Sequence, residues 1–563
     1  MTLRNPPVTP ELPASTNAGQ ARAQALQAPI QIDGQPTSIV TYQSAGRVVI
    51  IGTEDAALAA AQKLGEDIQC TVLVPSAARP EPGTRDGRVI VRGGRPEVEG
   101  RLGRFSVNLA TPDEVVSLSE AAGWAGSHFD LVLDLSDPPL LSHEILPVGY
   151  YAAGGSDKSL ARALAEIPEM RGEFEKPKYF NYDPGICAHG SSGLKGCTRC
   201  IDACPTLAIS SIGDKVSVDP YLCQGAGSCV AACPSGAMSY AFPAVSDLLA
   251  HLKLLLAGFR DAGGEDPVLL FHDAWARETV LGKLGPAMPE NILPFEIEEV
   301  GSIGLDTWLA VLAYGARAVV VAVTDSAPRR MVAEVEAQVD FGRGILAGMG
   351  FPAASLTVVN SARAAEDVDG WWRELPEKAL AKPAKFVLPD DKRAILRLAI
   401  DHLYRQAPTP RKAAALPAGA PFGEIKVDKD ACTLCMSCVS VCPVAALGAG
   451  GDLPQLKFTE WNCVQCGLCE KACPEDAITL HTRFLYDAEL RQQPRILHEE
   501  QPFCCVSCGK PFGTRSLLES MMRRLEGHWM FQNEEARRRL QMCEQCRVKD
   551  MFKSGKPDGG PLA

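Results

Sequence analysis

The chain has 563 residues, long enough for about three to five domains at ~100–200 residues each. Its formal net charge of −12 argues against nucleic acid or an anionic membrane as its main partner. No run of ~18 uninterrupted apolar residues occurs, and the first residues lack the apolar stretch of a secretory signal. We therefore expect a cytoplasmic protein without membrane insertion.

Residues 1–45 are rich in Pro, Ala, Gln and Ser and predict a mobile tail. Residues 46–170 predict a small α/β domain, because "GRVVIIGTEDAALAAAQKL" is typical of a strand, a glycine turn and a helix. A dinucleotide-binding fingerprint starting at Gly52 would need glycines where Glu54 and Ala57 stand. We interpret this domain as a degenerate Rossmann-like scaffold in which a bound flavin is not expected.

Two cysteine-rich modules and a second α/β domain are expected further along the chain. Apolar runs at 267–273, 315–323 and 355–360 have the length of buried strands and alternate with amphipathic segments. A helix is expected over 391–406, followed by the Pro- and Ala-rich linker 407–421. The predicted fold class is therefore multidomain, α/β plus α+β. The expected units are a first cysteine-rich module (178–245), the second α/β domain (246–365), a helix and linker (366–423), a second cysteine-rich module (424–480) and a helical segment with a further cysteine site (481–563).

The 21 cysteines are unevenly distributed along the chain. Cys70 stands alone and is expected to be a buried strand residue, whereas all the others fall in three blocks. In a chain without a secretory signal, such clustering indicates metal binding rather than disulfides. The physical reason is that one ion or cluster must be reached by several thiolates at once.

The second cysteine-rich module contains two complete runs of the form C-x2-C-x2-C-x3-C-P, "CTLCMSCVSVCP" and "CVQCGLCEKACP". This module resembles bacterial two-cluster ferredoxins, in which three cysteines of one run and the fourth cysteine of the other hold each 4Fe–4S cluster. Zinc is disfavoured, since it takes four ligands in C-x2-C pairs and eight thiols in this register have no such use. The expected ligands are Cys432, Cys435, Cys438 and Cys473 for cluster one, and Cys463, Cys466, Cys469 and Cys442 for cluster two.

The first cysteine-rich module follows the same register with two gaps. Leu194 stands where the first run would have its first cysteine, and Ala226 stands where the second run would have its second cysteine. A Gly- and Ser-rich loop between Cys187 and Cys197 allows Cys187 to return to the first vacant corner, where His189 is the competing ligand. The expected ligands of cluster three are Cys187, Cys197, Cys200 and Cys233.

Only three thiolates remain for cluster four, those of Cys223, Cys229 and Cys204. Because alanine cannot bind iron, a 3Fe–4S cluster is the preferred expectation. The alternatives are a 4Fe–4S cluster whose fourth iron takes water or a neighbouring side chain, and an empty site. The three-thiolate arrangement resembles seven-iron ferredoxins, which also lack a ligand in one run.

The last block contains two C-x2-C pairs separated by 34 residues. A C-x2-C-G knuckle aims two sulfurs at one ion, and its glycine accepts the positive φ of the turn. A structural zinc is preferred, and a further iron–sulfur cluster is the main alternative. Cys504 and His528 are competing ligands. The expected zinc ligands are Cys505, Cys508, Cys543 and Cys546.

The second α/β domain resembles the delta subunit of methyl-viologen-reducing hydrogenases. The resemblance rests on "GLDTWLAVLAYGARAVVVAV" and "GRGILAGMGFPAASLTVVN". Members of that family carry cysteines before the first helix and after the strand, where this chain has "VGSIG" (300–304) and "AVTDS" (322–326). The resemblance therefore implies a docking scaffold without that family's cluster.

Taken whole, the chain resembles large cytosolic 4Fe–4S ferredoxin-type proteins encoded beside bacterial formate dehydrogenase genes. The resemblance rests on stretches such as "HGSSGLKGCTRCIDACPTLAI" and "CGKPFGTRSLLESMMRRLEGHWMF". It implies an electron-transfer or accessory role near a molybdenum or tungsten enzyme such as formate dehydrogenase, with proteins as redox partners.

An electron conduit is the preferred interpretation, relaying single electrons through up to four clusters between partner proteins. In the intact module cysteine binds every iron, which suits outer-sphere transfer and leaves no substrate site. The alternatives are an assembly or maturation factor for a metalloenzyme, and a flavin-containing oxidoreductase subunit. The sequence shows neither a nucleophile–base pair nor a phosphate-binding loop that would favour an enzyme.

Overall fold

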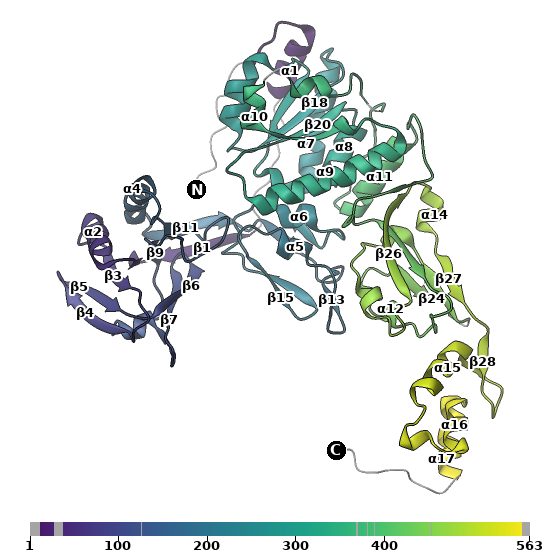
Figure 1. Ribbon diagram of the computed structural model, residues 1–563. Helices are drawn as coiled ribbons and strands as arrows, with labels where there is room; N and C mark the ends of the chain where they lie inside the picture. Colours follow the sequence, from purple (N-terminus) through teal and green to yellow (C-terminus); the bar gives the residue numbers. More distant parts are fainter. Residues whose placement is uncertain are drawn as a thin grey trace.

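The computed structural model describes residues 12–27, 38–124, 126–241, 243–367, 370–379, 381–387, 389–451 and 453–553. Within these residues the chain forms several α/β and α+β units (Figure 1). No described helix combines the length and the apolar character that crossing a bilayer requires.

Part of the segment expected to be a mobile tail forms regular elements, helix α1 (Asn17–Gln27) and strand β1 (Ile39–Ser44). Helix α1 packs on the second α/β domain, where Ala21 and Ala25 are buried and Arg22 donates a hydrogen bond to Ile292 O at 3.2 Å. The tail prediction was wrong for these two elements, because small side chains and one buried guanidinium give the helix a packing face. The remainder of the predicted tail, 1–11 and 28–37, lies outside the described residues.

The N-terminal α/β domain contains a six-stranded sheet in the order β10-β9-β2-β3-β5-β4. All neighbouring strands are parallel except β4 and β5. Cys70 lies in strand β3 and is partly buried. The six strands and the two helices beside them are β2 (Arg47–Ile51), α2 (Glu54–Leu64), β3 (Gln69–Val74), β4 (Glu81–Arg85), β5 (Arg88–Arg92), β9 (Leu131–Asp134), β10 (Tyr150–Ala152) and α4 (Asp157–Glu166). A second sheet consists of β6 (Arg95–Arg101), β7 (Arg104–Ala110) and β8 (Val115–Ser117), and the short helix α3 (Leu118–Ala121) follows it. Strand β11 (Gly172–Pro177) pairs with β1.

Glu54 begins helix α2 at the place where a dinucleotide fingerprint would have its second glycine. Its carboxylate accepts hydrogen bonds from Arg85 at 2.7 Å and from Arg92 at 2.7 Å. The ion pairs hold its pKa down at about 2, the Arg92 hydrogen bond being the largest cause. A charged carboxylate therefore occupies the end of the helix that would face a pyrophosphate.

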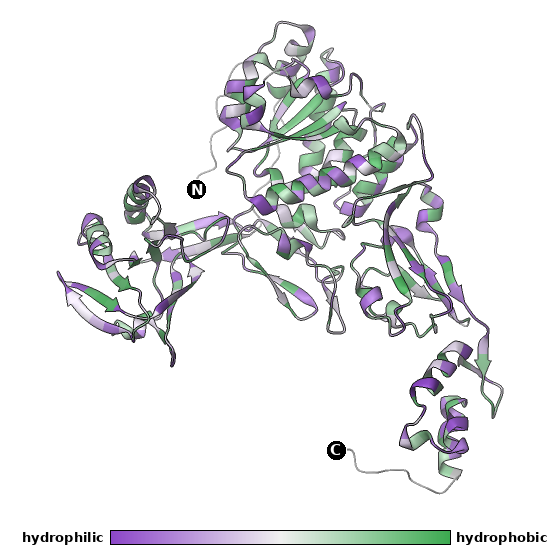
Figure 2. Cartoon of the chain, viewed as in Figure 1, coloured by the Kyte–Doolittle hydropathy of each residue, from purple (hydrophilic) through white to green (hydrophobic). Residues whose placement is uncertain are grey.

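The second α/β domain has an all-parallel sheet in the order β19-β18-β20-β21. Both faces of this sheet are covered, so its strands are almost continuously apolar, as Figure 2 shows. Helix α8 is buried along its whole length between α7, α9 and α11. The elements are α7 (Val245–Asp261), β18 (Val268–His272), β19 (Ile292–Glu296), α8 (Leu305–Ala313), β20 (Ala318–Val323), α9 (Arg329–Met349), β21 (Leu356–Asn360), α10 (Ser361–Glu366) and α11 (Lys392–Tyr404).

The two cysteine-rich modules repeat one plan: a strand, a cysteine loop with a short helix, an antiparallel hairpin, a second cysteine loop with a short helix, and a closing strand. The first module contains β12 (Phe180–Tyr182), β13 (Gly190–Ser191), β14 (Leu194–Lys195), α5 (Arg199–Asp202), β15 (Ile209–Ile212), β16 (Lys215–Val218), α6 (Ser228–Ala232) and β17 (Met238–Tyr240). The second contains β23 (Gly423–Val427), α12 (Ser437–Ser440), β24 (Leu447–Ala449), β25 (Gln455–Phe458), α13 (Leu468–Lys471) and β26 (Ile478–Leu485).

The segment expected to be a linker, 407–421, is part of the packed structure. Thr409 N donates to Met349 O at 3.1 Å, and strand β22 (Ala413–Ala415) pairs with β26 of the second module. Leu416 and Ala420 are buried in the core around α8 and α9. The segment therefore joins the second module to the second α/β domain rather than tethering it.

The C-terminal segment extends from the far side of the second module (Figure 1). Thr514 Oγ1 donates to Thr433 O at 2.9 Å, and Arg524 forms an ion pair with Glu475 at 2.9 Å. These contacts place the segment beside the first cysteine loop of the second module. Its elements are α14 (Ala488–Gln492), β27 (Arg495–Glu499), β28 (Pro502–Cys504), β29 (Pro511–Thr514), α15 (Arg515–Arg524), α16 (Glu534–Leu540) and α17 (Glu544–Lys553).

Candidate metal centres

In the second module the structure brings the cysteines together in the two sets that the spacing predicts. One cavity is lined by Cys432, Cys435, Cys438 and Cys473. A second cavity is lined by Cys442, Cys463, Cys466 and Cys469. In each cavity the fourth thiol comes from the opposite run, and the other lining is mostly apolar. Such thiol-only sites suit soft, thiolate-bound metal clusters rather than cations that prefer oxygen.

The local backbone turns each fourth cysteine toward its cavity in the same way. The residue three positions after each of these cysteines has a positive φ; these residues are Leu207, Gly236, Ala445 and Asp476. Backbone N–H groups then donate to the sulfurs, with Ala446 N and Ala477 N each 3.3 Å from the Sγ of Cys442 and Cys473. Donors to the sulfur atoms are a feature that stabilises iron–sulfur ligation and tunes its potential.

In the first module Cys187 returns to the corner that Leu194 leaves vacant. One cavity is lined by Cys187, Cys197, Cys200 and Cys233. His189 also lines this cavity, but its two ring nitrogens lie 2.8 Å from Cys197 O and 2.8 Å from Ser211 Oγ. Since both nitrogens already have partners, the geometry favours Cys187 over His189 as the fourth ligand.

The remaining three thiols of the first module line a separate cavity, with Ala226 at the corner that lacks a cysteine. These thiols belong to Cys204, Cys223 and Cys229. The short 3-10 helix η4 (Val300–Ser302) of the second α/β domain covers the corner. A Cβ atom added at Gly301 would lie 2.6 Å from Ala226 O, which shows how closely the two backbones approach.

Electrostatic interactions between thiols of different cavities indicate which cavities are neighbours. Burial raises the pKa of Cys229 well above its usual value, and neighbouring charges including those of Cys200 and Cys233 add to the effect. Burial, with the charges of Cys233 and Cys466, raises the pKa of Cys197 to about 11. Burial likewise raises the pKa of Cys469, to which the charge of Cys438 contributes. Each cavity is therefore close enough to the next for their thiols to interact.

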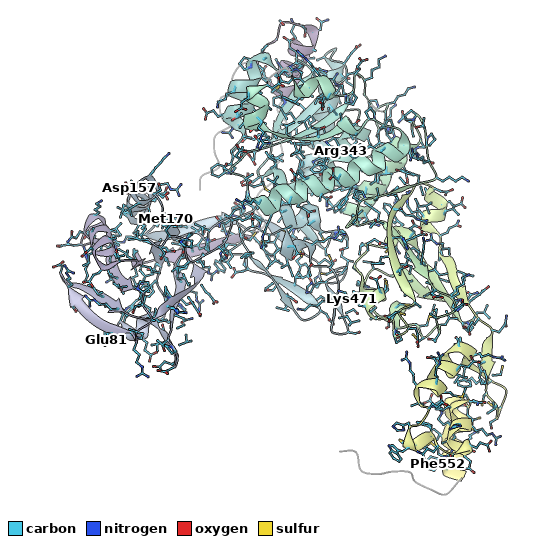
Figure 3. All side chains as sticks on the ribbon, in the orientation of Figure 1. Glu81, Asp157, Met170, Arg343, Lys471 and Phe552 are labelled. Carbon is cyan, nitrogen blue, oxygen red and sulfur yellow. The ribbon has the colours of Figure 1, made fainter. Side chains whose placement is uncertain are left out.

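The two modules are in direct contact at the point where a cavity of the first module lies next to a cavity of the second. A Cβ atom added at Gly196 would lie 2.7 Å from Leu468 Cγ and 3.2 Å from Cys466 O. Lys471 Nζ, on helix α13, donates to Lys195 O at 2.7 Å, and Figure 3 shows Lys471 on the side of the second module that faces the first. The residues flanking Cys197 thus pack against the loop that carries Cys466.

The C-terminal cysteines have a different geometry. The sulfurs of Cys505, Cys508, Cys543 and Cys546 all lie within 4.8 Å of one another. A tetrahedral ion with Zn–S bonds of ~2.3 Å places its sulfurs about 3.8 Å apart, and the sulfurs of Cys508 and Cys543 are 3.7 Å apart. The site is therefore sized for one ion, because a cluster would hold iron and sulfide between its thiolates.

The competing ligands of the C-terminal site lie elsewhere. Cys504 is exposed and is not among the grouped sulfurs, and His528 Nδ1 accepts a hydrogen bond from Met530 N at 3.3 Å. Burial opposes ionisation of Cys505, but N–H groups of Cys543, Ser507 and Cys508 outweigh it and lower its pKa to about 6. A thiolate at this position is ready to bind a metal near neutral pH.

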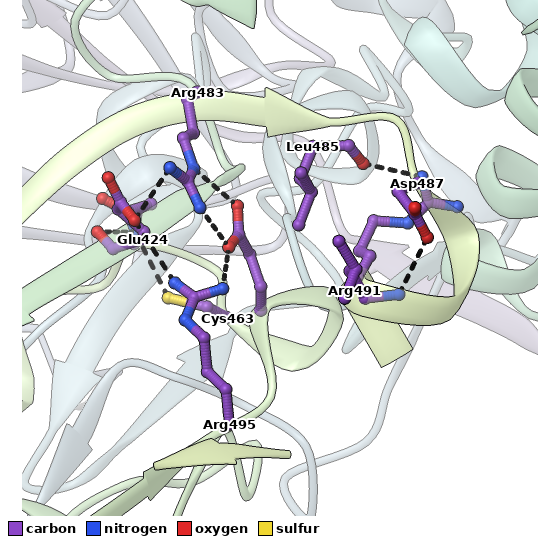
Figure 4. A network of polar contacts seen from close by, with 10 residues as sticks. Glu424, Cys463, Arg483, Leu485, Asp487, Arg491 and Arg495 are labelled. Atoms are coloured by element: carbon purple, nitrogen blue, oxygen red, sulfur yellow. Dashed lines mark hydrogen bonds and ion pairs between the residues drawn. The ribbon is translucent and has the colours of Figure 1, made fainter. Parts of the chain in front are cut away.

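The sequence analysis missed a buried ionic network behind one cysteine loop. Glu460, only 5% exposed, accepts hydrogen bonds from Arg483 at 2.8 and 2.9 Å and from Arg495 (Figure 4). Glu424 also forms an ion pair with Arg483 at 2.8 Å. Glu460 begins the 3-10 helix η7 (Glu460–Asn462), which leads directly into Cys463. The network therefore fixes the start of this loop.

Comparison with known families agrees with the repeated plan. Residues 181–234 and 424–474 each match the family model of the 4Fe-4S dicluster domain. No curated protein matches the chain. The two domain matches and the grouped cysteines support a ferredoxin-type iron–sulfur protein with a role in electron transfer.

Proposed function

We propose that the chain relays single electrons through four iron–sulfur centres arranged in one row. The observation that carries this proposal is the direct packing of Gly196 against Leu468 and Cys466, which joins the two dicluster domains. Iron–sulfur clusters supply the one-electron chemistry when bound, and the chain's residues hold them in sequence and exclude water. Among the described residues, we assign no other polar group to electron transfer.

The proposed ligand sets are those that line the four cavities. In order along the row these are Cys204, Cys223 and Cys229; then Cys187, Cys197, Cys200 and Cys233; then Cys442, Cys463, Cys466 and Cys469; and last Cys432, Cys435, Cys438 and Cys473. Cys435 is exposed, so the last site is the one open to a partner protein. For the C-terminal cysteines we propose one structural zinc ion, supported by the spacing of their sulfurs.

The proposed partners are redox proteins of the cytoplasm, and a formate dehydrogenase-type molybdenum or tungsten enzyme is the first to test. Anaerobically purified protein is expected to contain iron and acid-labile sulfide, to be reduced by a low-potential donor and to pass electrons to an acceptor protein. Proteins that co-purify would identify the partner. Protein that holds clusters but cannot be reduced, or cannot be reoxidised by any protein acceptor, would contradict the relay.

The contact between the modules gives a sharper test. Lys471→Glu replaces a donor to Lys195 O with a carboxylate and removes an exposed charge-assisted hydrogen bond, a loss of about 0.5–1 kcal/mol at this contact. We expect slower electron exchange between the two modules and weaker magnetic coupling between their clusters, with iron and sulfide content unchanged. Stopped-flow reduction and pulsed EPR would measure both.

The matched control for this test is Lys429→Glu. Lys429 is exposed in the same module, so the charge changes equally while the contact remains. Exchange as fast in Lys471→Glu as in the control would show that electrons do not cross at this contact.

A further inference from the structure

The corner of the row that lacks a cysteine has a hydroxyl group without a partner. Ser228 lines the cavity of Cys204, Cys223 and Cys229 and is 1% exposed. Its Oγ atom is buried and has no hydrogen-bond partner among the described residues. A buried hydroxyl in this state is unfavourable by about 1–3 kcal/mol unless it gains a partner. The hydroxyl is therefore available to a ligand or acceptor that the described residues do not provide.

The first cysteine run of the second module, which has all four cysteines, indicates where the Ser228 hydroxyl lies. Ser228 begins α6 and Ser437 begins α12, and each directly precedes the third cysteine of its run. The residue before each serine has a positive φ, 74° at Gly227 and 62° at Met436, so the two loops turn alike. Ser437 Oγ lies 3.4 Å from Cys435 Sγ, the thiol at the corresponding corner. Ser228 Oγ is therefore placed beside the position that a second-corner thiolate would occupy.

Other groups at this corner are already engaged. Thr206 Oγ1 lies 3.3 Å from Cys204 Sγ, and the side-chain amide of Gln224 donates to Leu146 O at 2.7 Å. Ser302, on the covering helix η4, donates to Glu299 O at 2.7 Å. Ala226 itself is 7% exposed, so the corner is closed to bulk water. Ser228 is the hydroxyl that remains for the corner.

We propose that Ser228 Oγ is the fourth ligand of this centre and binds an iron ion at the corner where Ala226 replaces cysteine. Binding through oxygen breaks the hydroxyl O–H bond and forms one iron–oxygen bond. The proton is taken up by a water ligand that the incoming iron ion loses, and no electron is transferred in this step. The inference rests on the iron–sulfur assignment of the cavity. It gives this centre a 4Fe–4S cluster with three thiolates and one oxygen, in place of the 3Fe–4S cluster that the cysteine count favours.

The test compares iron, sulfide and spectra of the full-length protein, purified and reconstituted anaerobically, with those of Ser228→Ala. The wild-type protein is expected to lack the EPR signal of an oxidised 3Fe–4S cluster. Ser228→Ala is expected to lose one iron ion per chain at constant sulfide and to gain that signal. Ser228→Cys, which restores a strong ligand from the same position, is expected to retain the iron.

Ser437→Ala is the matched control, because it removes the corresponding hydroxyl from a run with all four cysteines. It is expected to keep its full iron content. A 3Fe–4S signal in fully loaded wild-type protein, or unchanged iron and spectra in Ser228→Ala, would overturn the proposal while leaving the relay intact. Protein that holds no iron in any module would overturn both.

Discussion

Cys508→Ser is expected to release one zinc ion per chain and to unfold residues 502–553, while iron and sulfide stay at wild-type levels. The C-terminal segment has a small core: Cys505, Met542 and Cys543 form its buried cluster, and Leu518 and Leu540 are also buried. Its helices α15, α16 and α17 have 10, 7 and 10 residues, below the ~12–15 at which isolated helices become marginally stable. A bound zinc ion would therefore supply most of the stability of this segment; structural zinc binds zinc-finger peptides with about 10–16 kcal/mol.

Metal analysis and limited proteolysis would measure this effect. Cys504→Ser is the matched control, since Cys504 is adjacent in sequence to the proposed ligands but exposed and outside the grouped sulfurs. It is expected to keep both its zinc and its protease resistance. A loss of iron and acid-labile sulfide in Cys508→Ser, with no zinc in the wild-type protein, would instead assign a further iron–sulfur cluster to the segment.

Glu460→Gln is expected to destabilise the second module by about 3 kcal/mol, as breaking a buried ion pair does. The substitution leaves Arg483 and Arg495 with only Glu424 as a counter-charge. Because η7 leads into Cys463, the cluster held by that loop is expected to be lost first. Denaturation at pH 7, monitored through the visible absorbance of the clusters, would show both effects.

The pH dependence of the free energy of unfolding tests the role of the Glu460 carboxylate independently. Burial alone would raise the pKa of Glu460, but the hydrogen bonds from Arg483 and Arg495 outweigh it and the pKa is lowered. A lowered folded-state pKa gives stability that is present above the unfolded value of ~4.3 and is lost as the pH falls through the folded value. Glu460→Gln is expected to remove this dependence. Glu470→Gln, at an exposed position of the same module, is the control, and equal stability of the two variants would refute the assigned role.

Cysteine spacing was enough to predict which thiols would lie together. The reason is local: three cysteines in a tight loop and a fourth at the start of the return path leave few ways to face a common point. The family match confirms two 4Fe–4S dicluster domains. Even Cys187 could be placed, since the loop before Cys197 is long enough to return to the vacant corner.

Features that depend on distant contacts could not be predicted in this way. The packing of Gly196 against Leu468 joins residues far apart in sequence and has no local signature. The segment 407–421 has the composition of a linker, yet Ala413–Ala415 pairs with β26, a distant contact that composition does not reveal. That the Ser228 hydroxyl lacks a partner can be found only from the structure around it. The cysteine spacing alone shows that Ser228 corresponds to Ser437.

The anchoring of 407–421 also determines what limits the speed of the relay. Because β22 pairs with β26 while Thr409 is bonded to the end of α9, the span between the dicluster domains is set by the fold and not by diffusion of a tether. In the proposed relay, internal electron exchange is therefore expected to be insensitive to solvent viscosity. The encounter with an outside protein is expected to slow in a viscous medium, so turnover measured against added glycerol would separate the two stages.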